Sequence, residues 1–282
     1  MIAITGASGQ LGQLVVEELL NTVAADQLVA IVRNPAKIKS FADRGVQVRA
    51  ASYEDKAALV QALNGVEKLL LISSSEVGQR AVQHRNVIDA AKEAGVKLIA
   101  YTSLLHADSS PLGLADEHIA TEEMLKQSGI PFVLLRNGWY TENYLASVPP
   151  ALQHGVFIGS TGEGKIAAAA RADYAAAAAK VMTLDNQAGK VYELAGDYGW
   201  TLSELTAELT KQSGKTVVYQ NLPEADFKAA LLGAGLPEGL AAMLANSDVG
   251  ASKGGLFDDS RQLSALIGRP TTTLAESMRA AL

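Results

Sequence analysis

Three glycines spaced three residues apart follow the first apolar run of the chain. The run Ile2–Thr5 has the length and composition of a buried strand, and Gly6, Gly9 and Gly12 come directly after it. From Leu11 onward, apolar residues recur with helical spacing. Glycines permit a tight turn and a close approach of the backbone to a ligand, and a helix N-terminus offers free N–H groups. The stretch therefore predicts a strand, a turn and a helix that bind the pyrophosphate of a dinucleotide.

Strand-like and helix-like segments alternate through the first half of the chain. Strands are expected at 2–5, 28–32, 46–50, 69–72, 98–102 and 132–135, and helices at 36–43, 55–63, 79–94 and 115–128. Most of these strands are continuous apolar runs, as in a parallel sheet covered by helices on both faces. We therefore predict an α/β fold with a doubly wound parallel sheet of the Rossmann type. Ligands of such sheets bind beyond the carboxyl ends of the strands.

The pattern changes after residue 136. Alanine-rich residues 167–180 predict a close-packed helix from about residue 173, and 190–195 predict a further strand. Further helices are expected at 201–213, 223–233, 236–246 and 271–281, with a strand at 216–220. We expect residues 1–155, with returning segments around 165–196, to form the dinucleotide-binding domain. Residues 197–282 are expected to form a smaller, mainly helical C-terminal lobe on the substrate side.

Composition limits the function classes. The net charge of -6 offers no basic surface for nucleic acid, and no apolar run reaches the ~18 residues of a membrane span. The absence of cysteine excludes disulfides and thiolate chemistry, and no grouping of His, Asp and Glu has metal-ligand spacing. Because a strand is expected from residue 2, no signal peptide is expected and the predicted location is cytoplasmic. The sequence leaves open whether the protein is a monomer or a homodimer.

Arg33 follows the second expected strand, 21 residues after Gly12. Folds that bind NAD usually carry a carboxylate there, which accepts hydrogen bonds from the ribose hydroxyls. A guanidinium can instead form charge-assisted hydrogen bonds with the 2′-phosphate of NADPH. Arg33 therefore predicts a preference for NADPH over NADH; the alternative is an ordinary exposed arginine.

Small hydroxyl residues follow the fourth expected strand. Ser73, Ser74 and Ser75 suit the space beside the nicotinamide ribose, and they would equally suit a turn that caps the helix at 79–94. Tyr101 closes the fifth strand, at the level where hydride transfer would take place. We therefore expect Tyr101 to line the substrate.

The Thr5–Gly12 turn, Arg33 and the stretch 134–144 resemble the NmrA-like branch of the atypical short-chain dehydrogenases. The runs KLLLISSSEVGQR, KLIAYTSLLHAD, LLRNGWYTENYL and SDVGASKGGLFDDS extend this resemblance along the chain. It implies a flavin-free oxidoreductase without a metal that binds NADPH and passes hydride directly to a small quinone. The cofactor-binding residues implied by the resemblance are Gly6, Ala7, Ser8, Gly9, Gln10, Leu11, Arg33, Ser73, Ser74, Ser75, Asn137, Gly138, Trp139, Tyr140, Thr141, Glu142 and Arg171.

The chain departs from the pattern of the wider short-chain dehydrogenase superfamily. That pattern has a tyrosine four residues before a lysine and a glutamate four residues after the lysine, where this chain has Leu114, His118 and Glu122. Without the phenol, no obvious group protonates a developing alkoxide, so alcohol dehydrogenation is disfavoured. Reduction of a quinone needs no such acid from the protein, because it gives a stabilised anion that solvent can protonate. Relatives also carry an aspartate where this chain has Ser52, which weakens an expected acceptor for the adenine amino group.

The sequence does not identify a catalytic residue, and its two candidates are His118 and Asn143. A histidine that titrates near neutral pH would suit proton delivery, although His118 would also suit a solvated or hydrogen-bonded helix face. Tyr144 is expected to line the substrate. Tyr144, Trp139 and Tyr140 would equally fit a core of aromatic side chains.

Two other functions remain open. Some NmrA-like proteins sense the NADP(H) ratio and dock to a protein partner, with little or no catalysis, and the resemblance allows a redox sensor of that kind. A reductase of another conjugated acceptor, such as a dye or an enone, would use the same cofactor site.

Overall fold

The computed structural model describes residues 1–282 and divides into two compact units. Unit 1 comprises residues 1–104, 116–136 and 171–192, and unit 2 comprises residues 105–115, 137–170 and 193–282. This division differs from the expected boundaries, because residues 105–115 and 137–155 belong with the C-terminal part of the chain. Segments that leave a sheet and pack elsewhere carry no composition signal, so a linear interpretation assigned them to the first domain.

Unit 1 holds most of a seven-stranded sheet with the order β3-β2-β1-β4-β5-β6-β8. The strands are β1 (Ile2–Thr5), β2 (Leu28–Val32), β3 (Gln47–Ala50), β4 (Lys68–Leu71), β5 (Leu98–Leu104), β6 (Phe132–Asn137) and β8 (Val191–Leu194). Strand β1 pairs in parallel with both β2 and β4, so the strand order reverses direction beside β1. A reversal of this kind opens a crevice at the carboxyl ends of the strands.

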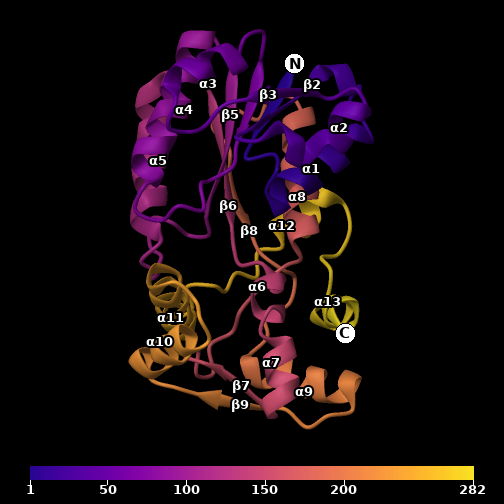
Figure 1. Cartoon of the computed structure of the whole chain (residues 1–282), viewed down its shortest axis with the longest axis vertical. Coiled ribbons are helices and arrows are strands. Elements are labelled where there is room, and N and C mark those ends of the chain that lie inside the picture. Colours follow the sequence, from indigo (N-terminus) through magenta and orange to yellow (C-terminus); the bar gives the residue numbers. More distant parts are fainter. The chain divides into compact units, whose positions relative to one another are not determined.

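Helices cover both faces of this sheet. Figure 1 shows α3 (Lys56–Ala62), α4 (Arg80–Ala94) and α5 (Ala115–Ser128) on one face, and α1 (Gln10–Leu20), α2 (Lys39–Asp43) and α8 (Arg171–Thr183) on the other. The 3-10 turns η1 (Ala25–Gln27) and η2 (Pro35–Ile38) flank β2. Every residue of β2 and β5 is buried, which explains the continuous apolar sequence of β2. The alanine-rich α8 packs closely against α1, because small side chains let the two helices approach.

Unit 2 combines helices with a two-stranded parallel sheet. Its strands are β7 (Val156–Gly159) and β9 (Val218–Asn221). Its helices are α6 (Thr141–Leu145), α7 (Val148–His154), α9 (Leu202–Ser213), α10 (Glu224–Gly233), α11 (Glu238–Ser252), α12 (Gln262–Ile267) and α13 (Leu274–Ala281). Thr201 and Thr273 begin α9 and α13 with capping boxes, in which each threonine and the glutamate three residues later satisfy one another's backbone N–H groups.

The predicted fold class is confirmed, and the expected strands of the first half match β1 to β6 within two residues at each end. The helix expected near residue 173 and the strand expected at 216–220 correspond to α8 and β9. Strand β7 and the short helices α6, α7 and α12 were not predicted. Each is seven residues or shorter, too short to show a clear period, and β7 is defined by its pairing with the distant β9.

Candidate functional site

The glycine turn after β1 brings the backbone onto the start of α1. Gly6 has a φ of +61°, a conformation that side chains rarely adopt. A Cβ at Gly12 would overlap the carbonyl oxygen of Gly6 and would lie 2.7 Å from Cα of Ala7. The glycines at both positions are therefore required by the geometry of the turn, as the sequence predicted.

The N-terminus of α1 has no side-chain cap. Gly9 is its N-cap residue and has no side chain, and Gln13 bonds its Nε2 to the carbonyl oxygen of Ser8 at 2.9 Å. The backbone N–H groups of Gln10 and Leu11 are among those that an α-helix leaves without an internal partner. These N–H groups and the positive end of the helix dipole suit an anion such as a pyrophosphate.

Arg33 leaves the sheet at the same edge as the glycine turn. Thr5 of β1 lies in register with Ile31 of β2, so Gly6 and Arg33 follow neighbouring strand ends. The Arg33 side chain is 73% exposed, and its Nη1 lies 2.9 Å from Oε1 of Glu76. Arg33 is therefore on the surface but paired, and no sequence pattern indicated Glu76 as its partner.

The serine run lies in a turn after β4 and does not cap α4. The N–H of Ser73 donates to Oγ1 of Thr102 at 2.8 Å, and Ser74 Oγ accepts from the N–H of Glu76 at 3.1 Å. The N-cap of α4 is Gln79. Of the two roles considered for the serines, capping of this helix is not observed.

Two residues of α4, Arg80 and His84, hold the backbone of Ser74 in place. Its N–H donates to Nε2 of His84 at 3.0 Å, and its carbonyl oxygen accepts from Nε of Arg80 at 2.5 Å. Since His84 Nε2 accepts a hydrogen bond, the proton of the neutral ring is on Nδ1, which lies 2.9 Å from Oγ1 of Thr121. Burial and the Arg80 cation lower the pKa of His84 to about 3. His84 is therefore neutral, and the serine turn is held rigidly by buried side chains.

Two of the predicted site residues, His118 and Tyr101, are buried beside Arg80 and His84. Nδ1 of His118 lies 2.8 Å from the phenol oxygen of Tyr101, and its Nε2 faces Nη1 of Arg80 at 3.5 Å. Burial, together with the Arg80 charge, lowers the pKa of His118 from 6.5 to about 3. Of the two roles that the sequence left open for His118, the buried position and the lowered pKa match a hydrogen-bonded helix residue and do not match titration near neutral pH.

Tyr101 is a core residue of unit 1. Its side chain is fully buried in the main apolar cluster, and burial raises the pKa of its phenol. The expectation that Tyr101 lines the substrate is corrected accordingly, because no surface of the side chain is left for a ligand. Alternation along β5 points Tyr101 into the layer beneath α4 and α5, a direction that the apolar sequence of the strand did not reveal.

The segment from the last residue of β6 into α6, residues 137–142, belongs to unit 2. Tyr140 forms a parallel bridge with Ala169, and the N–H of Thr141 donates to the Ala169 carbonyl oxygen at 3.0 Å. Oδ1 of Asn137 is buried without a hydrogen-bond partner. Buried polar atoms are normally satisfied, so this oxygen fits a site that a ligand or water completes. Trp139 is buried, Gly138 and Glu142 are part of the same segment, and Asn143 is exposed on α6.

Tyr144 packs inside unit 2. Its ring meets the Trp200 indole edge-on at 5.4 Å, and its hydroxyl donates to Oδ1 of Asp248 at 3.3 Å. With 8% of its surface exposed, Tyr144 matches the core role that the sequence left open. Asp248, which sequence reasoning missed, also accepts from the N–H of Ser160 at 2.8 Å. Arg171, in unit 1, is the first residue of α8.

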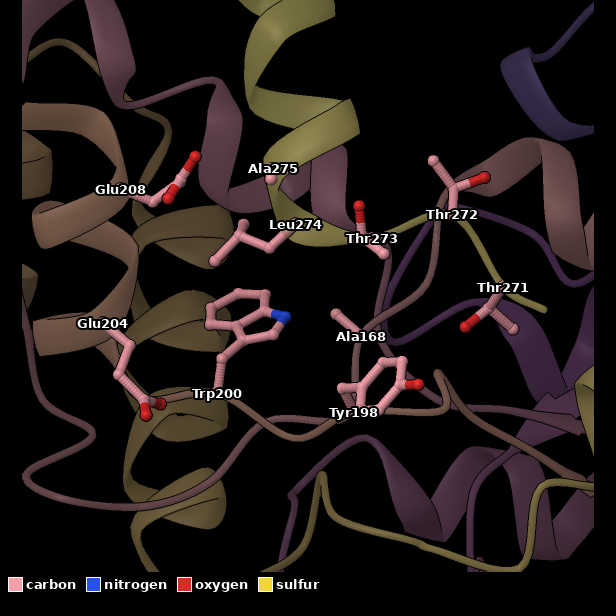
Figure 2. Close-up of a pocket in the computed structure, with 10 residues that line it drawn as sticks. All are labelled: Ala168, Tyr198, Trp200, Glu204, Glu208, Thr271, Thr272, Thr273, Leu274 and Ala275. Carbon is pink, nitrogen blue, oxygen red and sulfur yellow. The ribbon is translucent and has the colours of Figure 1, made fainter. Parts of the chain in front are cut away.

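A cavity of about 310 Å³ in unit 2 contains none of the predicted site residues. Figure 2 shows Trp200 and Tyr198 at its base, α13 residues above and the glutamates of α9 on one side. Both glutamates already have partners, since Glu204 belongs to a capping box and Glu208 accepts from Gln212. The lining residues come from three separate segments of the sequence, at 168, 198–208 and 271–275, so no local pattern could indicate this cavity. The full lining is Ala168, Tyr198, Trp200, Glu204, Glu208, Thr271, Thr272, Thr273, Leu274 and Ala275.

Neither a metal-binding group nor a membrane helix is found. No three His, Asp or Glu side chains are grouped so that they could hold a metal ion. None of the helices has the length and apolar character needed to cross a bilayer.

Comparison with known proteins gives consistent matches over the whole chain. The model of the NmrA-like family matches residues 1–276. The chain is 73% identical over 278 residues to quinone oxidoreductase 2 of Escherichia coli strain K12, covering 99% of this chain and 97% of that protein.

Solved structures agree with this match. The structure of an NADPH-dependent quinone oxidoreductase from Escherichia coli complexed with NADPH superimposes with a TM-score of 0.98, at 73% identity and 99% coverage of both chains. The Citrobacter sp. triphenylmethane reductase complexed with NADP(H) gives a TM-score of 0.96 at 40% identity, with both chains fully covered.

Proposed function

The chain belongs to the NmrA-like family, and from this membership we propose that it is an NADPH-dependent quinone oxidoreductase. The observation that carries the proposal is the uncapped glycine turn with Arg33 at the adjacent strand end. The 73% identity of the chain to a quinone oxidoreductase, over nearly its full length, supports a quinone as the acceptor.

The residues of unit 1 fit NADPH. The uncapped start of α1 would receive the pyrophosphate, where a Cβ at Gly12 would displace the turn. Arg33 would pair with the 2′-phosphate, which a guanidinium binds through charge-assisted hydrogen bonds. Ser73 to Ser75, held by Thr102, His84 and Arg80, would border the nicotinamide ribose.

When bound, NADPH supplies a hydride, and we propose that a quinone accepts it directly, without a flavin. The chain's own contribution is orientation and exclusion of water, because a well-placed donor and acceptor remove much of the entropic barrier. Both side chains are buried, and burial lowers the pKa of His118 and raises the pKa of Tyr101, so neither is suited to protonate the reduced quinone. The reduced quinone anion would take its proton from solvent, and Asn143, exposed on α6, remains a proposed contact of the acceptor. The predicted cytoplasmic location remains a prediction.

The test is steady-state loss of NADPH absorbance with simple benzoquinones, using protein whose visible spectrum shows no flavin. Turnover above the non-enzymatic rate, with a lower KM for NADPH than for NADH, is expected. An Arg33→Gln variant should raise the KM for NADPH about tenfold, since a hydrogen bond to a charged group is worth roughly 1.5–3 kcal/mol, with little change for NADH. NADPH binding without turnover would refute the enzyme and favour the NADP(H) sensor with a protein partner.

A second class of acceptor should be tested in the same assay. A triphenylmethane reductase of 40% identity has the same fold at a TM-score of 0.96, so a cationic triphenylmethane dye is the alternative substrate. Decolourisation faster than benzoquinone reduction at equal concentration would favour the dye.

A further inference from the structure

The guanidinium that would bind the 2′-phosphate already has an anionic partner. Nη1 of Arg33 lies 2.9 Å from Oε1 of Glu76, and the two side chains are 73% and 39% exposed. Glu76 follows the serine run in the turn between β4 and α4. Both members of the pair therefore belong to segments assigned to cofactor binding, although only Arg33 was predicted from the sequence.

The Glu76 carboxylate is fixed by the fold. Its second oxygen, Oε2, accepts from Nε2 of Gln83 at 2.8 Å, and its backbone N–H donates to Oγ of Ser74 at 3.1 Å. Gln83 is 4% exposed, and its own Oε1 is buried without a partner. The turn thus presents a carboxylate at Arg33, while the residue that supports it is left with one unsatisfied atom.

The two cofactors would respond differently to this carboxylate. A 2′-phosphate brings nearly two negative charges to Arg33, where it must displace Glu76 or share the guanidinium with it, and like charges a few ångströms apart repel. A 2′-hydroxyl carries no charge, and a carboxylate is the group that accepts its hydrogen bond in folds that bind NAD.

We propose that Glu76 is a specificity-determining residue, which competes with the 2′-phosphate of NADPH for Arg33 and accepts a hydrogen bond from the ribose of NADH. The inference rests on the proposed function, because it requires that NADPH binds at Arg33. Glu76 then makes the preference for NADPH over NADH smaller than Arg33 alone would give. When NADPH binds, the contact between Arg33 and Glu76 is released.

The experiment compares dissociation constants of NADPH and NADH for the wild-type chain and Glu76→Gln, by calorimetry at 50 and 300 mM salt. Glutamine keeps the length of the side chain and one acceptor oxygen, but it removes the charge and replaces the second acceptor oxygen with an NH2 donor. Glu76→Gln should bind NADPH about 2- to 5-fold more tightly, the range set by the strength of exposed ion pairs. Its affinity for NADH should be equal or lower, and the gain for NADPH should shrink at high salt.

Glu17→Gln provides a matched control. Glu17 also forms an exposed ion pair, with Arg44, at 2.7 Å between Oε1 and Nη1, and its substitution changes the net charge by the same amount. Glu17 and Arg44 both lie outside the glycine turn and the serine turn. NADPH affinity of this variant should equal that of the wild type.

An Arg33→Gln background completes the cycle. In this background, Glu76→Gln should change the NADPH affinity less than it does in the wild-type chain. The reason is that the cation for which Glu76 and the 2′-phosphate compete is absent. Glu76→Gln that binds NADPH no more tightly than Glu17→Gln would overturn the role of Glu76 while leaving the proposed function intact. A wild-type chain that fails to bind NADPH, or an Arg33→Gln variant with unchanged NADPH affinity, would instead contradict the proposed cofactor site.

Discussion

Single residues in this protein acquire their chemistry from burial. Asp248 is 6% exposed and accepts hydrogen bonds from Tyr144 and Ser160. Burial raises the pKa of its carboxyl group from 3.8 to about 6, and the two hydrogen bonds oppose this only in part. Similarly, His118 is a candidate acid in the sequence and a neutral core residue in the structure.

Asp248 predicts a pH dependence of stability in unit 2. Because its pKa is raised on folding, its protonated form stabilises the folded state fully below about pH 4, and this stability is lost as the pH rises through 6. A shift of this size corresponds to about 3 kcal/mol. Asp248→Asn should therefore gain stability relative to the wild type between pH 4 and pH 8, by up to about this amount.

Urea unfolding followed by tryptophan fluorescence measures this difference, since Trp139 and Trp200 both lie in unit 2. Titration of all other groups cancels when the wild type is subtracted from the variant at each pH. A difference between the two proteins that does not change with pH would contradict the assigned role of Asp248.

At the scale of elements, buried polar contacts join helices to strands. Glu122 of α5 forms a bidentate pair with Arg136 of β6, with Nε and Nη2 at 2.9 and 2.8 Å from its two oxygens. Ser103 of β5 donates to the same carboxylate at 2.6 Å. Glu122 stands where the wider superfamily pattern has its glutamate, and here it holds α5 against two strands.

Glu122→Gln should destabilise unit 1 by about 3–5 kcal/mol, because it removes the carboxylate that pairs with the buried Arg136 guanidinium. Urea unfolding followed by far-ultraviolet circular dichroism measures the change. The control is Glu123→Gln on the same helix, where the pair with Lys126 is about half exposed, so a loss of about 1 kcal/mol or less is expected. Equal losses in the two variants would refute a structural role for the buried pair.

At the scale of the whole molecule, cofactor binding couples to stability. A ligand that binds only the folded chain at 100 times its dissociation constant stabilises it by about 2.7 kcal/mol. NADPH should therefore raise the Tm by several degrees, and NADH at the same concentration should raise it less, because NADH lacks the 2′-phosphate that is proposed to pair with Arg33.

Gly12→Ala should abolish this protection, since its Cβ would overlap the Gly6 carbonyl and displace the turn. Differential scanning fluorimetry with and without each nucleotide provides the measurement. Gly239→Ala in α11, where an added Cβ meets no atom within 4 Å, should keep the full NADPH response. Protection of Gly12→Ala equal to that of the wild type would place the cofactor elsewhere.

The sequence by itself determined the fold class, the order of strands and helices in the first half, and the glycine turn with Arg33. These features are local: a buried strand, a glycine requirement or a helical period is set by a few neighbouring residues. The family resemblance added the cofactor and the acceptor class, which the 73% identity to a quinone oxidoreductase now supports.

Only the tertiary structure decided the division of the chain, the burial of Tyr101, Tyr144 and His118, and the pairing of Arg33 with Glu76. Each of these depends on contacts between residues far apart in the sequence, 43 positions apart for Arg33 and Glu76. A side chain's exposure, its pKa and its charge partner are properties of such contacts. They become fixed only when the parallel strands bring the ends of distant segments to one edge of the sheet.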